Sequence, residues 1–248
     1  MTSRMLVAGS SGQLGRPTFA ALAALGHDVQ GVTRRGRAGS LAADFISGEG
    51  VDAAVEGVHT LVQTATTNGP ADLQMARHLV TAAVRAKVEH LVLISIVGID
   101  QIPLGFYRDR LAIESIIERS GIPFTIQRAT QFHSFIDRGF RVQRWSPVVF
   151  VPSTLIQPIA VEEVGARLAE LANGPAQGRV TDIGGPQTRR SEDFYRLWRY
   201  ATGGKKPRIP VHLPGKFFAA YDAGLNVVPG PAYGTSTFKT YLTSRYLS

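Results

Sequence analysis

Apolar and polar residues follow two different spacings along this chain. Short apolar runs bounded by glycine or polar residues predict strands at 5–8, 28–33, 41–44, 59–65, 90–97 and 123–129. Between these runs, apolar residues recur every three or four positions. This second spacing predicts helices at 14–25, 51–55, 71–87 and 107–120.

This alternation of strands and helices predicts an α/β fold with a doubly wound parallel sheet of the Rossmann type. Parallel strands need crossover connections, and right-handed helical crossovers cover both faces of such a sheet. After residue 130 the order changes. We expect helices at 134–144, 161–172, 191–200 and 215–225, with Ser191 as an N-cap, and strands at 148–151, 155–160 and 179–183.

The chain therefore divides into two regions in this interpretation. Residues 1–130 form a dinucleotide-binding core, and residues 131–248 form a smaller α+β lobe that packs with the core as one unit and binds substrate. The prolines and glycines between 229 and 234 predict an irregular tail.

A glycine-rich turn joins the first predicted strand to the first predicted helix. Gly9 suits a tight turn, Gly12 lets the backbone approach a diphosphate, and Gly15 lets the helix pack close to the sheet. Free amides at a helix start attract anions. The turn predicts a nucleotide-binding loop, with an ordinary structural turn as the alternative; the expected contacts are Gly9, Ser11, Gly12, Gln13, Leu14 and Gly15.

Composition excludes several classes of protein. Hydrophobic residues make up 44% and charged residues 19%, as in globular chains. The absence of cysteine excludes disulfides, thiolate nucleophiles and cysteine metal sites, and the histidines form no metal-binding pattern. No apolar stretch approaches the roughly 20 residues that span a bilayer. We expect a cytoplasmic protein with no membrane partner and no metal.

The formal net charge of +8 is compatible with an anionic partner. The densest basic cluster lies on and after a predicted helix, where charges usually form a solvated face. No nucleic-acid-binding module accompanies it, so we expect no nucleic-acid partner. The cluster consists of Arg189, Arg190, Arg196, Arg199, Lys205, Lys206 and Arg208.

Three stretches of the sequence resemble a known family. They are the glycine turn at 9–15, the segment at 88–100 (VEHLVLISIVGID) and the segment at 120–133 (SGIPFTIQRATQFH). Together they resemble the atypical short-chain dehydrogenase/reductases of the NmrA-like NAD(P)H-binding type. The resemblance implies a nucleotide-binding sheet and a substrate site beside it.

Arg34 and Arg35 follow the second predicted strand, where such folds bind the adenosine ribose. An acidic residue there favours NAD, whereas guanidinium groups suit the additional phosphate of NADP. We therefore expect NADP(H) as cofactor; two solvated arginines are the alternative.

The resemblance also implies two further cofactor contacts. Asp44 and Phe45 match the pair beside the adenine ring, and Thr64, Ala65 and Thr66 match the strand end beside the nicotinamide ribose. Packing in the core is the competing explanation for both sets.

The catalytic residues depart from the family pattern. The wider superfamily pairs a tyrosine with a lysine, whose charge lowers the phenol pKa. Here Tyr107 is followed by Arg110 three residues later and by Leu111 four residues later. Arg110 keeps a positive charge that could anchor a ribose or an anionic substrate, but it cannot release a proton. We expect Glu114 to pair with Arg110.

Four further residues are candidates by position in the family. Ser95 lies near the serine that polarises a carbonyl, with an ordinary serine at a strand end as the alternative. Gln131 and Phe132 follow the sixth strand beside the substrate. His133 is the alternative proton donor if Tyr107 is not one, although a histidine merely hydrogen-bonded in the wall is the favoured interpretation.

Three functions remain open. We favour an NADPH-dependent reductase of a small carbonyl, quinone, imine or activated alkene. The alternatives are an NADP(H)-sensing regulator and a non-redox isomerase or cyclase. The sequence is compatible with a monomer or a homodimer.

Overall fold

The structure, a computed structural model, describes residues 3–34, 36, 40–211 and 214–247. It divides into two compact units. The first contains residues 1–95, 105–128 and 164–181, and the second contains 96–104, 129–163 and 182–248. The segment 164–181, which the sequence analysis placed in the smaller lobe, thus packs with the first unit.

A seven-stranded parallel sheet forms the centre of the first unit, as predicted. Its order, β3-β2-β1-β4-β5-β6-β9, reverses direction beside β1, which is the usual ligand position in doubly wound sheets. The strands are β1 (Arg4–Ala8), β2 (Asp28–Thr33), β3 (Ser40–Ala42), β4 (Thr60–Gln63), β5 (His90–Ile96), β6 (Phe124–Ala129) and β9 (Gly178–Arg179).

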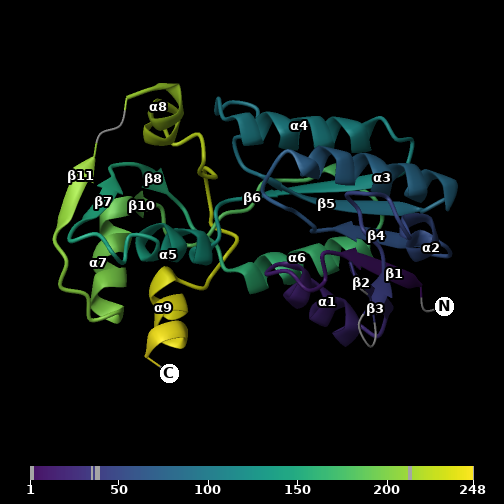
Figure 1. The fold of residues 1–248 in the computed structure, drawn as a ribbon, viewed down its shortest axis with the longest axis horizontal. Helices are drawn as coiled ribbons and strands as arrows, with labels where there is room; N and C mark the ends of the chain where they lie inside the picture. The colour runs from purple at the N-terminus through teal and green to yellow at the C-terminus, as the bar shows by residue number, and fades with distance from the viewer. Residues whose placement is uncertain (1–2, 35, 37–39, 212–213, 248) are drawn as a thin grey trace. The chain divides into compact units, whose positions relative to one another are not determined.

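Helices cover both faces of this sheet (Figure 1). On one face lie α1 (Gly15–Ala24) and α6 (Val161–Asn173); on the other lie α2 (Val51–Val55), α3 (Ala71–Arg85) and α4 (Gly105–Glu118). Gly165 of α6 lies against the backbone of α1, where a β-carbon would come within 2.9 Å of the amide nitrogen of Thr18. The main apolar cluster lies under α2, α3 and α4.

The second unit combines helices with two small sheets. β8 (Leu155–Ile156) pairs antiparallel with β10 (Arg189–Arg190), and β7 (Val149–Pro152) pairs parallel with β11 (Arg208–Val211). The helices are α5 (His133–Arg141), α7 (Ser191–Ala201), α8 (Lys216–Asp222) and α9 (Phe238–Tyr246).

Several local predictions in this unit are wrong. Ser191 does not cap α7: Arg190 is the N-cap, and the Ser191 hydroxyl donates to the Thr154 carbonyl at 3.1 Å. The strand expected at 155–160 ends at Ile156, because Pro158 has no amide to donate. The sequence analysis also missed β10, β11 and α9.

Candidate functional site

The glycine turn is closed by contacts that only glycine permits. Gly9 has φ +84°, and its carbonyl accepts a hydrogen bond from the Gly12 amide at 2.8 Å. A β-carbon at Gly15 would lie 2.0 Å from the Gly9 carbonyl oxygen. A β-carbon at Gly9 would lie 2.7 Å from the Ala65 backbone. The turn is thus held between α1 and the residues that follow β4.

This turn fits a dinucleotide diphosphate by its chemistry. No side chain caps the N-terminus of α1, where the first amides of a helix have no partner within the helix. Ser11, Gly12 and Gln13 are exposed, whereas Leu14 and Gly15 are buried beneath them. The loop therefore presents backbone to solvent at the positive end of a helix dipole, which is the arrangement that binds phosphate.

The end of β2 lies beside the same turn. A β-carbon at Gly31 would come within 2.5 Å of the Ser10 hydroxyl, so the loop and β2 are in close contact. Arg34 is exposed in the turn that follows β2. Arg35 lies outside the described residues.

Asp44 and Phe45 have structural roles in the turn after β3. The Asp44 carboxylate accepts the Ile46 amide at 2.8 Å, and its backbone closes the turn with Gly48 and Glu49. Phe45 is buried in the apolar cluster, and its carbonyl bonds to His78 Nδ1 at 3.0 Å. These contacts favour the packing explanation over adenine binding.

The residues after β4 form a hydrogen-bonded loop against the glycine turn. The Thr64 hydroxyl donates to the Ala8 carbonyl at 2.7 Å, which ties this loop to β1. The hydroxyls of Thr66 and Thr67 both donate to the Asp72 carboxylate, at 2.5 and 2.6 Å. The Thr67 amide donates to the same carboxylate at 2.6 Å. Asp72 therefore fixes the loop that contacts Gly9.

Arg110 belongs to this hydrogen-bonded cluster. Its Nη2 lies 2.6 Å from Asp72 Oδ2 and 2.5 Å from the Thr66 hydroxyl. Both members of the pair are buried, and burial lowers the pKa of Arg110 from its ordinary value while Asp72 opposes that shift. The predicted pairing of Arg110 with Glu114 is wrong. Glu114 instead forms a two-pronged ion pair with Arg128 of β6, at 2.9 and 2.7 Å.

Both ion pairs lie in one polar layer at the carboxyl end of the sheet. Side chains alternate along a strand, so Gln63, Ser95 and Arg128 continue the face that Leu61, Leu93 and Ile126 present to α3 and α4. Ser95 Oγ and Gln63 Oε1 are buried with no hydrogen-bond partner among the described residues. Buried polar atoms normally have partners, so these two are candidates for a ligand contact.

Tyr107 lies on the sheet side of α4 with an exposed fraction of 5%. No lysine can pair with it in this unit, because Lys87 is the only lysine before residue 205. Lys87 lies before the amino end of β5, whereas Ser95 lies near the carboxyl end of the same strand. The strand between them covers roughly 20 Å at about 3.3 Å per residue. The first unit therefore offers Tyr107 no lysine at the carboxyl end of its strands.

The remaining candidates lie in the second unit. The Gln131 amide donates to the Tyr221 hydroxyl at 3.3 Å, and Phe132 forms an isolated bridge with Ile159. Burial lowers the pKa of His133 to about 4. Its Nε2 donates to the Pro158 carbonyl at 3.1 Å, so Nε2 carries the only proton at neutral pH. This favours the wall interpretation of His133 over a proton donor.

The sequence analysis missed Asp72 and Thr67. Asp72 looks like an ordinary acidic residue in the first turn of α3, and such residues usually interact with the helix dipole. Its position three residues before the buried Met75 was the only sign that it faces the core. Which threonine and which arginine it contacts depends on the fold.

Comparison with known families identifies the nucleotide-binding region. A family described as NAD(P)H-binding matches residues 9–146, which include the glycine turn, Asp72 and Arg110. The chain belongs to this NAD(P)H-binding family. The NAD(P)H binding that the sequence resemblance implied is thereby confirmed at the level of the family, and the expected nicotinamide dinucleotide is the ligand of that family.

Solved structures with the same fold cover nearly the whole chain of this family member. An NADPH-dependent quinone oxidoreductase from Escherichia coli matches with a TM-score of 0.80 and 16% identity, over 98% of this chain and 99% of that one. A nucleoside-diphosphate-sugar epimerase from Staphylococcus aureus gives 0.79 and 16%, over 96% and 99%. A Citrobacter triphenylmethane reductase complexed with NADP(H) gives 0.70 and 17%, over 97% and 94%.

Other comparisons add less. No curated protein matches the sequence significantly. In the part of the chain that the structure describes, no helix is both long and apolar enough to cross a bilayer, and no group of three acidic or histidine side chains is arranged to hold a metal ion.

Proposed function

We propose that this protein is an NADPH-dependent oxidoreductase that reduces a small electrophile: a carbonyl, quinone, imine or activated alkene. The glycine turn is the observation that carries the proposal. Its glycines pack closely against the uncapped start of α1 and against the loop after β4. Membership in the NAD(P)H-binding family supports the same cofactor class.

Each end of the cofactor has proposed contacts. The turn at Gly9, Ser11, Gly12, Gln13, Leu14 and Gly15 binds the diphosphate, and Arg34 and Arg35 bind the additional phosphate of NADP. Thr64, Ala65 and Thr66 line the nicotinamide end. NADPH, when bound, supplies the hydride.

The residues available for proton transfer narrow the proposed substrates. Arg110 is held by Asp72, and neutral His133 donates its one N–H to the Pro158 carbonyl. The first unit offers Tyr107 no lysine. We propose that Ser95 donates a hydrogen bond to the substrate oxygen and that no side chain acts as a strong acid. Electrophiles whose reduced form is a stabilised anion, such as quinones, need little protonation in the transition state. They are therefore favoured over simple ketones.

The same observations favour a second candidate, a regulator that binds NADP(H) without turnover. Missing acid–base residues do not affect dinucleotide binding, and a regulator needs only a change of affinity for a protein partner.

Two measurements test the proposal. Affinity for NADPH and NADH is compared by calorimetry in the wild type and in R34A, and turnover is followed as loss of NADPH absorbance with a panel of quinones and ketones. We expect NADPH to bind more tightly than NADH and R34A to lose about ten- to hundredfold for NADPH only, because a hydrogen bond to a charged group is worth about 1.5–3 kcal/mol. Tight binding without turnover of any acceptor supports the regulator. Equal binding of NADH overturns the NADPH assignment.

A further inference from the structure

Helix α5 in the second unit carries apolar side chains on both of its faces. Its inner face is buried and consists of His133, Ile136, Asp137 and Phe140. On its outer face, Phe135 is 64% exposed and Val142, the C-cap residue, is 63% exposed. Trp145, in the turn that follows, is 85% exposed. Outer faces of helices are normally polar, so this pattern requires a physical reason.

Contacts on the inner face fix the orientation of α5. The buried Asp137 carboxylate accepts hydrogen bonds from Trp198 Nε1 of α7 at 2.8 Å and from the Tyr246 hydroxyl of α9 at 2.6 Å. Phe140 packs edge-on against Tyr195, with ring centroids 5.4 Å apart. The helix therefore cannot rotate to bury Phe135 and Val142 without breaking these bonds.

Arginines flank the exposed apolar side chains. Arg138, Arg141 and Arg144 are all exposed, and the Arg144 guanidinium lies 5.3 Å from the centre of the Trp145 ring. Lys206 adds a further positive charge, because its ammonium donates to the backbone carbonyls of Gln143 and Arg144.

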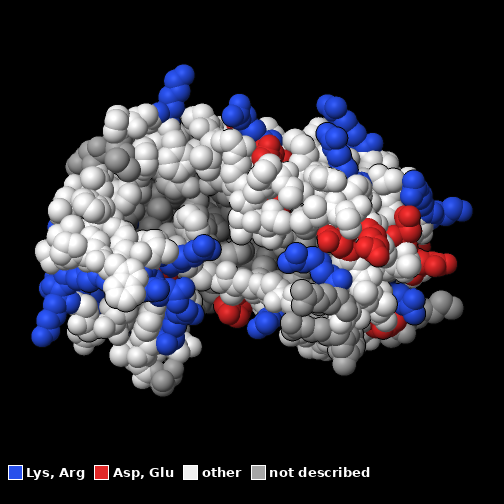
Figure 2. Space-filling view, in the orientation of Figure 1, with Lys and Arg blue, Asp and Glu red and all other residues white. Residues whose placement is uncertain are grey.

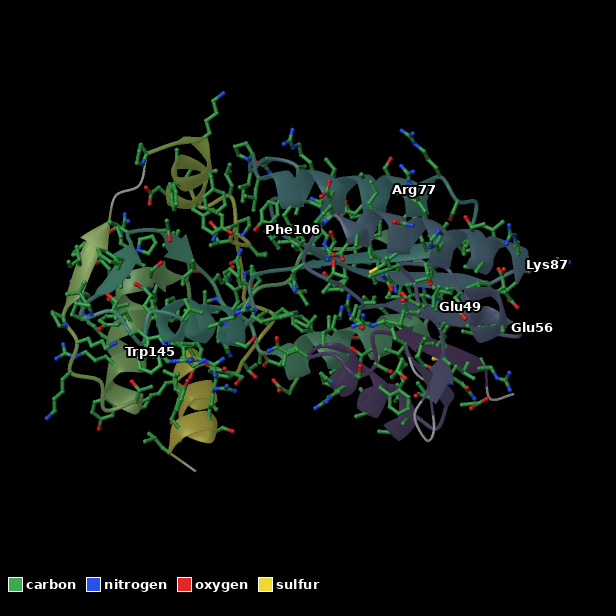
Figure 3. All side chains as sticks on the ribbon, in the orientation of Figure 1. Glu49, Glu56, Arg77, Lys87, Phe106 and Trp145 are labelled. Carbon is green, nitrogen blue, oxygen red and sulfur yellow. The ribbon has the colours of Figure 1, made fainter. Side chains whose placement is uncertain are left out.

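Acidic side chains are missing from this part of the sequence. The only one between residues 129 and 161 is the buried Asp137. Figure 2 shows Lys and Arg atoms gathered on the surface of this unit, and Figure 3 labels Trp145. We call the group Phe135, Arg138, Arg141, Val142, Arg144 and Trp145 the α5 outer surface.

These features match a planar anionic partner. Exposed aromatic and aliphatic side chains on one side of a helix and in the turn after it, bordered by arginines, are typical of segments that lie in the interface of a bilayer. Guanidinium groups pair with the phosphates of lipid headgroups, and Trp prefers the interfacial region. Single-stranded nucleic acid also binds arginine and aromatic rings, but it offers nothing apolar to contact Val142.

We propose that the α5 outer surface binds peripherally to an anionic lipid membrane. The sequence analysis excluded a membrane partner because no segment is long enough to span a bilayer. Binding to the surface of a bilayer needs no segment of that length. The proposal is independent of the dinucleotide.

Trp145 provides a direct measurement. The chain has two tryptophans, and the other, Trp198, bonds to Asp137. In W198F, emission reports Trp145 alone. We expect a red emission maximum in buffer, a blue shift on adding vesicles of phosphatidylcholine with phosphatidylglycerol, and no shift with phosphatidylcholine alone. If W198F does not fold, co-sedimentation of the wild type and W145A with the same vesicles decides, and W145A is expected to remain in solution.

A matched pair of variants separates this surface from net charge. R138Q/R141Q/R144Q removes three charges from the surface, and R77Q/R108Q/R119Q removes three exposed charges from the first unit. Each arginine near an anionic bilayer contributes about fivefold in binding. We expect the first triple variant to lose about a hundredfold in vesicle affinity and the second to retain it.

Four outcomes overturn the proposal. Equal loss in both triple variants indicates general charge attraction. Blue emission of a monomer without vesicles shows that the chain itself covers Trp145, and a shift that appears only with rising protein concentration shows a second copy. A shift with a single-stranded oligonucleotide but not with vesicles indicates nucleic acid.

Discussion

Single residues of the glycine turn carry different parts of the proposed function. Gly15 is needed for the fold, since a β-carbon there would overlap the Gly9 carbonyl at 2.0 Å. At Gly12 the same distance is 3.0 Å, which a small shift relieves. A methyl group at Gly12 would instead occupy the space that a diphosphate approaches. Folding and binding are therefore separable within one turn.

We predict opposite effects for the two alanine variants. G15A loses about 3 kcal/mol or more of folding free energy through overpacking. G12A keeps nearly wild-type stability but weakens NADPH binding about ten- to hundredfold, because it loses backbone contacts to a charged group. Urea denaturation and calorimetry with NADPH measure the two quantities. A stable G15A, or a G12A that binds NADPH normally, contradicts this assignment.

His133 makes a pH-dependent contribution to stability. Its pKa is about 4 in the folded protein against 6.5 for the free side chain, so the unfolded chain binds more protons between these values. Stability is therefore full above pH 6.5 and falls as the pH decreases toward 4. The loss from this residue alone is about 2 kcal/mol between pH 7 and pH 5.

The variant H133Q tests this contribution, since glutamine keeps an N–H donor near Pro158 and does not titrate. We expect urea denaturation of H133Q to show a smaller loss of stability from pH 7 to pH 5 than the wild type. Part of the slope remains, because burial also lowers the pKa of His90. An unchanged slope in H133Q would mean that His133 is accessible to protons in the folded state.

At the residue scale, sequence patterns predict backbone requirements better than side-chain partners. The glycines at 9 and 15 were predictable because close backbone contacts permit only one residue type there. The partner of Arg110 was not, because helix spacing favours Glu114 whereas the fold brings Asp72 to it from α3 and Arg128 to Glu114 from β6.

At the scale of elements, two buried ion pairs hold α4: Asp72–Arg110 joins it to α3, and Glu114–Arg128 joins it to β6. Asp72–Arg110 also holds the loop of Thr66 and Thr67, which contacts the glycine turn. Glu114–Arg128 joins α4 to β6 without touching that loop. The second pair is thus a matched control for the first.

We predict that D72N and E114Q are destabilised to a similar extent but differ in cofactor binding. Removing one partner of a buried ion pair costs about 3–5 kcal/mol in each case. Only D72N is expected to bind NADPH more weakly, since only its loop packs on Gly9. Denaturation and titration of NADPH fluorescence at a temperature where both variants are folded provide the test. Equal affinity in the two variants would show that the Asp72 cluster has a purely structural role.

Element types in the first unit followed from periodicity, because buried strands and amphipathic helices each impose a spacing on apolar residues. All six strands predicted before residue 130 are present, with ends that differ by at most two residues. In the second unit the strands are two to four residues long. Such short strands carry too few residues for a pattern, so β10 and β11 were missed.

At the scale of the whole molecule, the chain passes five times between the two units. A division at residue 130 therefore separates the first unit from α6 and β9, which complete one face and one edge of its sheet. Residues near Gly165 and Pro17 are in direct contact across that division. The order of elements in the sequence indicates a switch after β6 but not the return of the chain to the first unit.

We predict that the fragment 1–130 does not fold to a native state. Without α6, the face that α1 shares with it is left partly uncovered, and apolar surface without a partner favours loose or aggregated states. Near-ultraviolet circular dichroism of the fragment should show no fixed aromatic environment, whereas the full chain should. A fragment with a cooperative melting transition and NADPH binding would contradict this.

The distribution of lysine has a consequence for chemical modification. Lys87, the only lysine in the first 204 residues, lies between α3 and β5, and every other lysine belongs to the second unit. For the proposed reductase, we expect reagents that acylate amines to leave hydride transfer intact and dicarbonyl reagents directed at guanidines to abolish it. Protection by NADPH against the latter would place arginines, and not lysines, in the proposed cofactor site.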